Sequence, residues 1–305
     1  MQAKKRNKQN LNGFLNIYKN KGISSNQVLG QIKKILHPQK IGHGGTLDVM
    51  AEGVLPVALG EATKTLQFIL DGNKEYEFEL TWGFETDTLD LEGETVKTCD
   101  KVPTKEEIEA KLADFTGVVE QIPPMYSALK FNGKNAYELA RAGEEVDMTK
   151  KRRNVEIFSF ELLKHEGGKS FFRAAVSKGT YIRTLGIDLA RSLDSCATVS
   201  QLIRTKAKKF DKKSSICIKK LDELVKNAHN SQDLLLNVDI VLDDIPVFIA
   251  SNGQAADLKN GQIKFVLSDI GLYRIYNEEN VLLSIVNNTV DGIKIMRNFN
   301  LTDIG

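Results

Sequence analysis

The clearest periodic pattern in the chain lies between residues 74 and 82, where polar and apolar side chains alternate without a break. The apolar positions are Tyr76, Phe78, Leu80 and Trp82, and the intervening positions are Glu75, Glu77, Glu79 and Thr81. Successive side chains of a strand point to opposite faces of its sheet. The pattern therefore predicts a strand of an antiparallel sheet, with one buried face and one face in contact with water.

Other strands are predicted on both sides of this one. Residues 154–165 and 171–177 indicate a hairpin joined at Gly167 and Gly168. Shorter strands are predicted at residues 14–18 and at the apolar run of residues 54–58.

Helical spacing of apolar residues is clearest at Val28, Leu29, Ile32, Ile35 and Leu36. Ser24 or Ser25 is expected to cap this helix, and Pro38 to end it. Thr104 and Glu107 have the spacing of a capping box and predict the start of another helix. Further helices are predicted at residues 61–70, 133–143 and 185–193.

The composition of the chain changes near its end, and residues 238–244 mark a junction. Beyond it, residues 273–276 and 281–286 predict short strands separated by a polar turn. A small β-rich unit is therefore expected over residues 244–305.

Composition places the protein among globular chains with a sizeable core, since 41% of its 305 residues are hydrophobic and 27% are charged. No apolar stretch is long enough to span a membrane, and the basic start lacks the apolar segment of a secretory signal. Cys99, Cys196 and Cys217 are odd in number and widely spread, which fits neither a zinc site nor a disulfide framework. A reducing cytoplasm is therefore the expected setting. The four histidines are equally scattered, so no metal site is expected.

The net charge of +2 predicts no nucleic-acid partner by itself, but the charges are distributed unevenly. Residues 204–220 hold eight Lys or Arg and one acid, and residues 150–153 form a second basic run. Local basic patches are typical of phosphate contact, with a solvated surface run as the alternative.

The densest candidate chemistry lies at residues 42–56, where three glycines surround His43 and precede the lone carboxylate of Asp48. Glycine allows positive φ and close approach of a ligand, so this stretch predicts a shaped loop that presents Asp48. An ordinary glycine-rich turn with a solvated aspartate is the alternative. The whole run resembles the G-H-x-G-T-L-D-P-x-A-x-G-x-L signature of the TruB-type tRNA pseudouridine synthases.

Four later segments resemble further motifs of that family in the same order. Residues 83–93, 121–130, 178–185 and 201–205 resemble G-x-x-T-D-T-x-D-x-x-G, Q-x-P-P-x-Y-S-A-x-K, K-G-T-Y-I-R-[ST]-L and L-R-R-T. The first of these segments lacks the spacing of a calcium loop, so we expect its acids and threonines to form a hydrogen-bonded turn. The chain departs from the family pattern at Gly44, Val49, Glu52 and Ile203.

The resemblance implies an α+β fold, with a mixed and largely antiparallel sheet flanked by helices and a small C-terminal β-rich, PUA-like domain. The expected parts are a basic flexible tail (1–10), a catalytic domain (11–243) and a PUA-like RNA-binding domain (244–305). A thumb-like insertion is expected at about residues 124–153 of the catalytic domain.

The resemblance also implies roles for individual side chains. Asp48 is expected to attack ribose C1′ or to take the 2′ proton, and Arg183 to orient it. Tyr76 is expected to stack on the uracil and is a possible base, and His43 to fill the space of the flipped base. Expected substrate contacts are Lys74, Tyr181, Leu202, Tyr126, Lys130, Arg153 and Arg204.

The expected reaction is isomerisation of uridine 55 in the tRNA T arm to pseudouridine by base flipping, glycosidic bond cleavage and reattachment through C5. It needs no cofactor, metal or obligatory protein partner, and the C-terminal domain is expected to contact the acceptor stem. One alternative is a non-catalytic RNA-binding or tRNA-folding protein. A second is a glycosidase that hydrolyses the bond, although retaining glycosidases use two carboxyl groups and only Asp48 stands out here.

Overall fold

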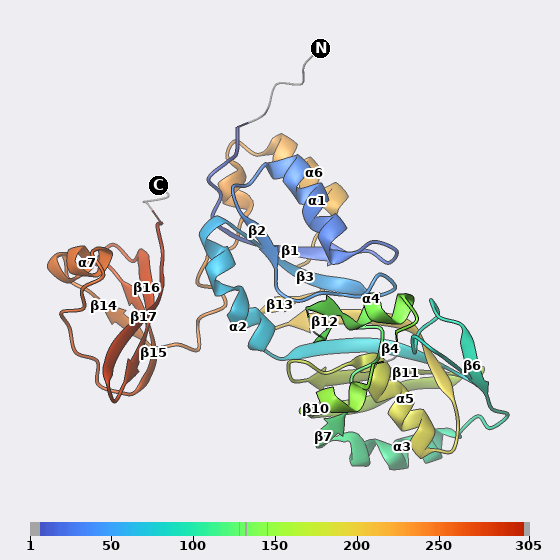
Figure 1. The fold of residues 1–305 in the computed structure, drawn as a ribbon. Helices are drawn as coiled ribbons and strands as arrows, with labels where there is room; N and C mark the ends of the chain where they lie inside the picture. Colours follow the sequence, from blue (N-terminus) through green and yellow to red (C-terminus); the bar gives the residue numbers. More distant parts are fainter. Residues whose placement is uncertain (1–6, 128, 132, 145, 302–305) are drawn as a thin grey trace.

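The computed structural model describes residues 7–127, 129–131, 133–144 and 146–301. Its largest feature is a nine-stranded sheet whose main path runs β1-β3-β12-β4-β11-β10-β7 (Figure 1). Residues 1–6 of the predicted basic tail lie outside the described residues, as do Ala128 and Asn132 of the predicted insertion.

The predicted strand at residues 74–82 is confirmed as β4 (Lys74–Trp82), in the middle of this sheet. It pairs antiparallel with β12 (Ala197–Ala207) and with β11 (Lys169–Val176). The predicted hairpin is confirmed, because β11 follows β10 (Arg153–Glu166), and β10 in turn pairs with β7 (Gly117–Gln121).

The other half of the sheet makes it mixed. There β12 pairs parallel with β3 (Glu52–Leu59), and β3 pairs antiparallel with β1 (Gly13–Lys19). Short strands β2 (Ile41–His43) and β13 (Phe210–Asp211) extend it off the main path. The α+β class with a largely antiparallel sheet is thus confirmed.

Helices cover the sheet in two groups. Against β4, β10 and β11 lie α3 (Lys105–Leu112) and α5 (Ile182–Ser192), which share an apolar core that includes Phe78, Phe172 and Leu189. At the other end, α1 (Ser25–Leu36) and α6 (Ile218–Asn227) pack beside β1 and β3. The predicted capping box at Thr104 is confirmed, and Ser24 is the residue that caps α1, where it forms a capping box with Gln27. The helix expected at residues 61–70 is instead a 3₁₀ turn (Gly60–Thr65) followed by α2 (Leu66–Asp71).

The polar face of β4, which carries its glutamates, is less exposed to solvent than the sequence predicts. Its three glutamates pair with cations of the neighbouring strands, as Glu75 with Lys206, Glu77 with Arg173 and Glu79 with Lys169. The carboxylate of Glu79 also accepts from Ser200, and the residue is buried. Because β4 is a central strand, both of its faces are flanked by side chains of other strands.

Shorter elements complete the part of the chain that precedes the C-terminal unit. The acidic segment after β4 is a hairpin of β5 (Phe84–Thr86) and β6 (Thr95–Thr98). The insertion contains β8 (Lys130–Phe131), β9 (Lys134–Asn135) and α4 (Ala136–Arg141). Three further 3₁₀ turns are Ala113–Phe115, Met148–Lys151 and Ser231–Leu234.

The predicted C-terminal β-rich unit is present as a separate four-stranded sheet (Figure 1). Its elements are β14 (Val247–Ile249), α7 (Asn252–Lys259), β15 (Gly271–Tyr276), β16 (Leu282–Thr289) and β17 (Gly292–Asn298). This unit has its own core and also packs against the junction, where the Tyr276 hydroxyl donates to Asp239.

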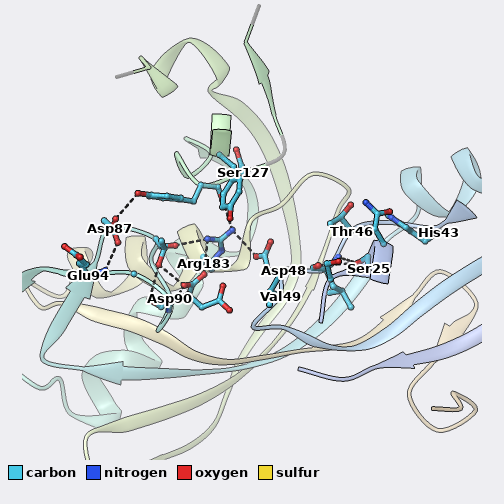
Figure 2. Close-up of a pocket in the computed structure, with 18 residues that line it drawn as sticks. Ser25, His43, Thr46, Asp48, Val49, Asp87, Asp90, Glu94, Ser127 and Arg183 are labelled. Atoms are coloured by element: carbon cyan, nitrogen blue, oxygen red, sulfur yellow. Dashed lines mark hydrogen bonds and ion pairs between the residues drawn. The ribbon is translucent and has the colours of Figure 1, made fainter. Parts of the chain in front are cut away.

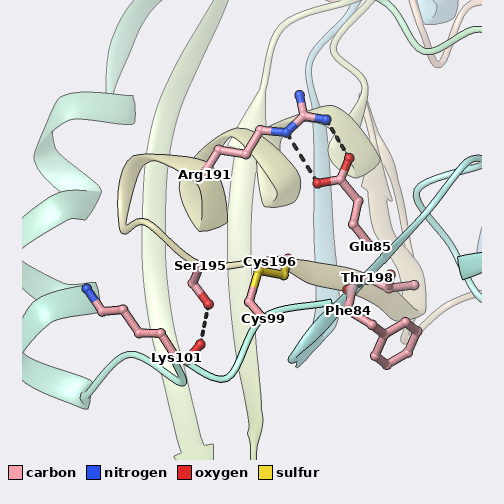
Figure 3. Close-up of a disulfide and its surroundings, with 8 residues drawn as sticks. All are labelled: Phe84, Glu85, Cys99, Lys101, Arg191, Ser195, Cys196 and Thr198. Carbon is pink, nitrogen blue, oxygen red and sulfur yellow. Dashed lines mark hydrogen bonds and ion pairs between the residues drawn. A yellow bond between two sulfur atoms is a disulfide. The ribbon is translucent and has the colours of Figure 1, made fainter. Parts of the chain in front are cut away.

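The prediction that the cysteines do not pair is wrong, because Cys99 and Cys196 form a disulfide (Figure 3). Both flank the backbone of Gly83, which donates to Cys196 O while its own carbonyl accepts from Cys99 N. Sequence spacing gave no sign of this contact, since 97 positions separate the two cysteines. The cysteines therefore do not indicate a reducing setting. Cys217 is exposed and unpaired among the described residues.

None of the helices in the described part of the chain combines the length and apolar character that a membrane crossing requires.

Candidate active site

The glycine-rich loop at residues 42–50 opens onto a pocket of about 630 Å³. The described lining comes from six parts of the chain: this loop, the start of α1, the acidic turn at residues 87–94, the first residues of the insertion, Tyr137 of α4 and Arg183 of α5. Figure 2 shows Asp48 between them, with Arg183 and Asp90 to one side and His43, Thr46 and Ser25 to the other. The structure thus brings together four predicted site residues, Asp48, Arg183, His43 and Tyr126.

Asp48 forms an ion pair with Arg183, with 3.0 Å between Oδ2 and Nη2. The Arg183 side chain is 5% exposed, whereas that of Asp48 is 41% exposed. The buried guanidinium therefore binds the Asp48 carboxylate on its protein side and leaves the carboxylate accessible from the pocket.

Arg183 is itself fixed by three further acceptors. Nη1 donates to the carbonyl of Thr88 (2.7 Å) and to Oδ2 of Asp90 (3.1 Å), and Nη2 donates to the carbonyl of Tyr126 (2.9 Å). Planar guanidinium groups bond several acceptors in a fixed geometry. The orientation of Arg183 is consequently set by the protein without Asp48.

The expected hydrogen-bonded turn after β4 is confirmed. Oδ1 of Asp90 accepts from Thr88 Oγ1 and from the backbone N–H of Glu92, and Asp87 accepts from the backbone N–H of Glu94. Sequence reasoning missed that Asp90 is a second carboxylate on Arg183. The alternation of Thr and Asp was the available signal, but nothing in it pointed to α5.

Two buried cations hold the backbone of the loop. Lys19 is fully buried and its Nζ donates to the carbonyls of Ala51 (2.6 Å), Ile23 (2.7 Å) and Asn20 (3.2 Å). Burial lowers the pKa of Lys19 to about 8. Lys19 was not predicted as a site residue.

Arg204 is the other loop-holding cation, and its predicted contact with RNA is wrong. The residue is 2% exposed, so its guanidinium is inaccessible to a phosphate. Its Nε donates to the carbonyl of Val54 (2.7 Å) and its Nη2 to that of Gly45 (3.0 Å). The basic composition of residues 204–220 suggested a surface, but β12 carries Arg204 inward.

Lys74 also faces the protein and not the pocket, which corrects its predicted substrate contact. Its Nζ donates to the carbonyls of Leu70 (2.6 Å) and Gly72 (2.5 Å) at the end of α2, and burial lowers its pKa to about 8. The basic segment is partly neutralised too, since Lys206, Lys208 and Lys209 pair with Glu75, Asp244 and Asp243.

His43 lies in the pocket lining as a half-buried side chain. Burial first, and Arg204 second, lower its pKa below the usual range, so the imidazole is neutral at pH 7. Its Nδ1 is buried and has no hydrogen-bond partner among the described residues. A neutral ring can enter a stack of bases with little desolvation cost.

Tyr76, Tyr181 and Leu202 are not among the described residues that line this pocket. Tyr76 and Leu202 join the main core on β4 and β12, and Leu47 and Met50 of the loop belong to the same cluster. The loop is therefore packed directly against the core that contains the predicted uracil-contacting residues.

The Tyr181 ring lies under the Arg153 guanidinium, whose Cζ is 5.0 Å from the ring centroid. The Gln121 side chain accepts from Tyr181 N (2.8 Å) and donates to Tyr181 O (3.0 Å), fixing the residue that precedes α5. Within the insertion, the Tyr126 hydroxyl donates to Asp87 and Lys130 is exposed.

The described residues contain no group of three or more His, Cys, Asp or Glu that could hold a metal ion.

The fold is shared with solved ribonucleoprotein subunits. A chain of an H/ACA ribonucleoprotein bound to a substrate RNA containing 2′-deoxyuridine superposes with a TM-score of 0.71 at 22% identity, over 95% of this chain and 85% of the other. A chain of a Cbf5–Nop10–Gar1 complex gives 0.69 at 24% identity, over 94% and 85%. The chain therefore has the fold of these subunits over nearly its whole length, the β-rich C-terminal sheet included.

Sequence comparison defines the family. Residues 33–182 match the N-terminal domain of the TruB family of pseudouridylate synthases. The tRNA pseudouridine synthase B of Rickettsia africae (strain ESF-5) is 45% identical over 253 residues, 82% of this chain and 72% of that protein. That of Rhodopseudomonas palustris is 42% identical over 263 residues, 85% and 71%. This chain belongs to the TruB family of pseudouridylate synthases and is an isomerase acting on RNA.

Proposed function

We propose that the protein isomerises uridine 55 in the T arm of tRNA to pseudouridine, with Asp48 as the key catalytic group. The observation that carries this proposal is the open carboxylate of Asp48 on the buried, four-fold bonded guanidinium of Arg183. Relatives named tRNA pseudouridine synthase B support tRNA as the substrate class.

The reaction breaks the bond from ribose C1′ to uracil N1 and makes a bond from C1′ to uracil C5. Asp48 either attacks C1′ or removes the 2′ proton, and both routes need an ionised carboxylate that faces the sugar. An opposite charge nearby favours the ionised form of an acid. Arg183 supplies that charge and keeps the carboxylate pointing into the pocket.

The target base must leave its stack to reach Asp48, which costs a few kcal/mol for unstacking and unpairing. In the proposed complex His43, neutral and at the pocket, occupies the vacated space. Tyr76 is proposed to stack on the flipped uracil, with Leu202 of β12 and Tyr181, which precedes α5, as further contacts of the base. The Tyr76 hydroxyl is also the candidate base for the C5 proton.

Exposed cations of the insertion, including Lys130, are proposed to bind the RNA. The C-terminal domain is proposed to bind the acceptor stem. Arg153 is proposed to contact the substrate beside Tyr181, whose ring lies under its guanidinium. No obligatory protein partner is proposed, and a tRNA substrate supports the cytoplasm as the proposed location.

The experiment is incubation of the enzyme with an unmodified tRNA transcript, followed by mapping of pseudouridine and assay of free uracil. We expect pseudouridine at position 55, no free uracil, and loss of product in Asp48→Ala with retained tRNA binding. Free uracil would identify a hydrolase. Binding without product in the wild type would support the alternative of a non-catalytic RNA-binding or tRNA-folding protein, and an active Asp48→Ala would remove Asp48 from the mechanism.

A further inference from the structure

One buried hydroxyl in the pocket has no role in the arrangement described above. Ser127 is 6% exposed and lines the same pocket as Asp48 and Arg183. Its Oγ is buried and has no hydrogen-bond partner among the described residues. Buried hydroxyl groups are nearly always hydrogen-bonded, because desolvation without a partner is unfavourable. An unpartnered one at an active site calls for an explanation.

The backbone around Ser127 is fixed, so the position of its side chain is set. Its N–H donates to Met125 O (3.0 Å), and its carbonyl accepts from Tyr137 N (3.1 Å) at the start of α4. The preceding carbonyl, that of Tyr126, accepts from the Arg183 nitrogen that contacts Asp48. Ser127 is thus placed next to the catalytic ion pair (Figure 2).

We propose that Ser127 is a substrate-positioning residue whose hydroxyl bonds an oxygen of the target uridine beside the reacting carbon. This rests on the proposed function, in which C1′ lies against Asp48. Two oxygens outside the sugar and base rings lie beside the reacting bond: the ribose 2′-hydroxyl is two bonds from C1′, and uracil O2 is two bonds from N1. The proposal concerns these two exocyclic oxygens. A serine hydroxyl can both donate and accept, so it suits either oxygen.

The first test compares Ser127→Ala with wild type in single-turnover pseudouridine formation on a tRNA transcript. We expect a loss of about three- to tenfold, the effect of one neutral hydrogen bond. The melting temperature should not fall, because Oγ bonds no described protein group. A fall in melting temperature that accounts for the lost activity would overturn the proposal, as would an unchanged rate.

Thr184→Val is the matched control. Thr184 is also 6% exposed with an unpartnered buried hydroxyl, but it lies outside the lining of this pocket. It should keep the wild-type rate. An equal loss in both variants would attribute the effect to removal of any buried hydroxyl and would overturn the proposal.

The partner oxygen is identified by binding of RNA with an altered target nucleotide. In an Asp48→Asn background, which stops turnover, Ser127→Ala should weaken binding of unmodified RNA about three- to tenfold. If Ser127→Ala no longer weakens binding when the target is 2′-deoxyuridine, the 2′-hydroxyl is the partner of Ser127. If it no longer weakens binding when the target is 2-thiouridine, uracil O2 is the partner. A difference that persists with both nucleotides overturns the proposal. An inactive wild type would instead reject the proposed function.

Discussion

Reduction of the Cys99–Cys196 disulfide is the perturbation whose effect on stability follows most directly from the structure. The bond joins the end of the β5–β6 hairpin, which carries Thr88 and Asp90, to the segment between α5 and β12. That hairpin and α5 together hold Arg183.

The expected loss of unfolding free energy on reduction follows from the length of the loop that the disulfide closes. The cysteines are 97 positions apart, and the chain-entropy relation gives about 4.7 kcal/mol for a loop of this size. With an unfolding entropy of about 2.1 cal/mol/K per residue over 305 residues, reduction should lower the melting temperature by about 7 °C. The reduced protein should stay folded, because Arg191–Glu85 and Ser195–Lys101 contacts span the same junction (Figure 3).

The assay is thermal and urea unfolding of the oxidised protein with and without a phosphine reductant, beside thiol titration. Cys99→Ser should reproduce the reduced state and should not respond to reductant. Cys217→Ser is the matched control, because this exposed cysteine lies outside the bond, and it should keep the full response. Three free thiols in the native oxidised protein, or a shift below about 1 °C when two thiols are released, would refute the reasoning.

Three further predictions concern the site and the grip on RNA. Arg183→Lys should lower the single-turnover rate about 100-fold with tRNA binding retained, because an ammonium cannot reproduce the planar set of four contacts; a loss under threefold would contradict this. Lys19→Met should destabilise the fold by about 3 kcal/mol through unpaired carbonyls, measured by urea unfolding. The pKa of Lys19 is about 8 in the folded protein and 10.5 in the unfolded chain, so between these pH values the unfolded chain binds more protons. The free energy of unfolding of the wild type relative to Lys19→Met should therefore rise from pH 8 to pH 10.5. A difference that does not change with pH would refute this prediction. Binding of tRNA should weaken about 40-fold from 50 to 200 mM salt if about three phosphates are neutralised, and a salt-independent affinity would exclude phosphate contact.

Local sequence signals predicted the elements that depend on neighbours in the chain. The alternation at residues 74–82, the serine cap of the helix that begins at Ser25 and the capping box at Thr104 each involve side chains a few positions apart, and each is confirmed. The pairing of Asp48 with Arg183 was reached only through the family resemblance, because nothing local relates positions so far apart.

What the sequence did not reveal depends on tertiary contacts. Lys19 and Arg204 lie in polar sequence surroundings that do not indicate burial. Both are nevertheless buried and donate to carbonyls in and next to the glycine-rich loop. The same limit hid the partnership of Asp90 with Arg183 and the meeting of the two cysteines. In each case the decisive partner is supplied by strand pairing across the sheet or by the packing of α5.

The central guanidinium also explains why the carboxylate and the insertion meet at one point. Nη2 of Arg183 is 3.0 Å from Asp48 Oδ2 and 2.9 Å from Tyr126 O, so one nitrogen contacts both the glycine-rich loop and the start of the insertion. Nη1 donates to Thr88 O and to Asp90, and these bonds prevent the guanidinium from turning toward Asp48 alone or toward Tyr126 alone. The direction of the Asp48 carboxylate and the position of the insertion are therefore set together, because a displacement of Tyr126 removes one of the contacts that fix the nitrogen bound to Asp48.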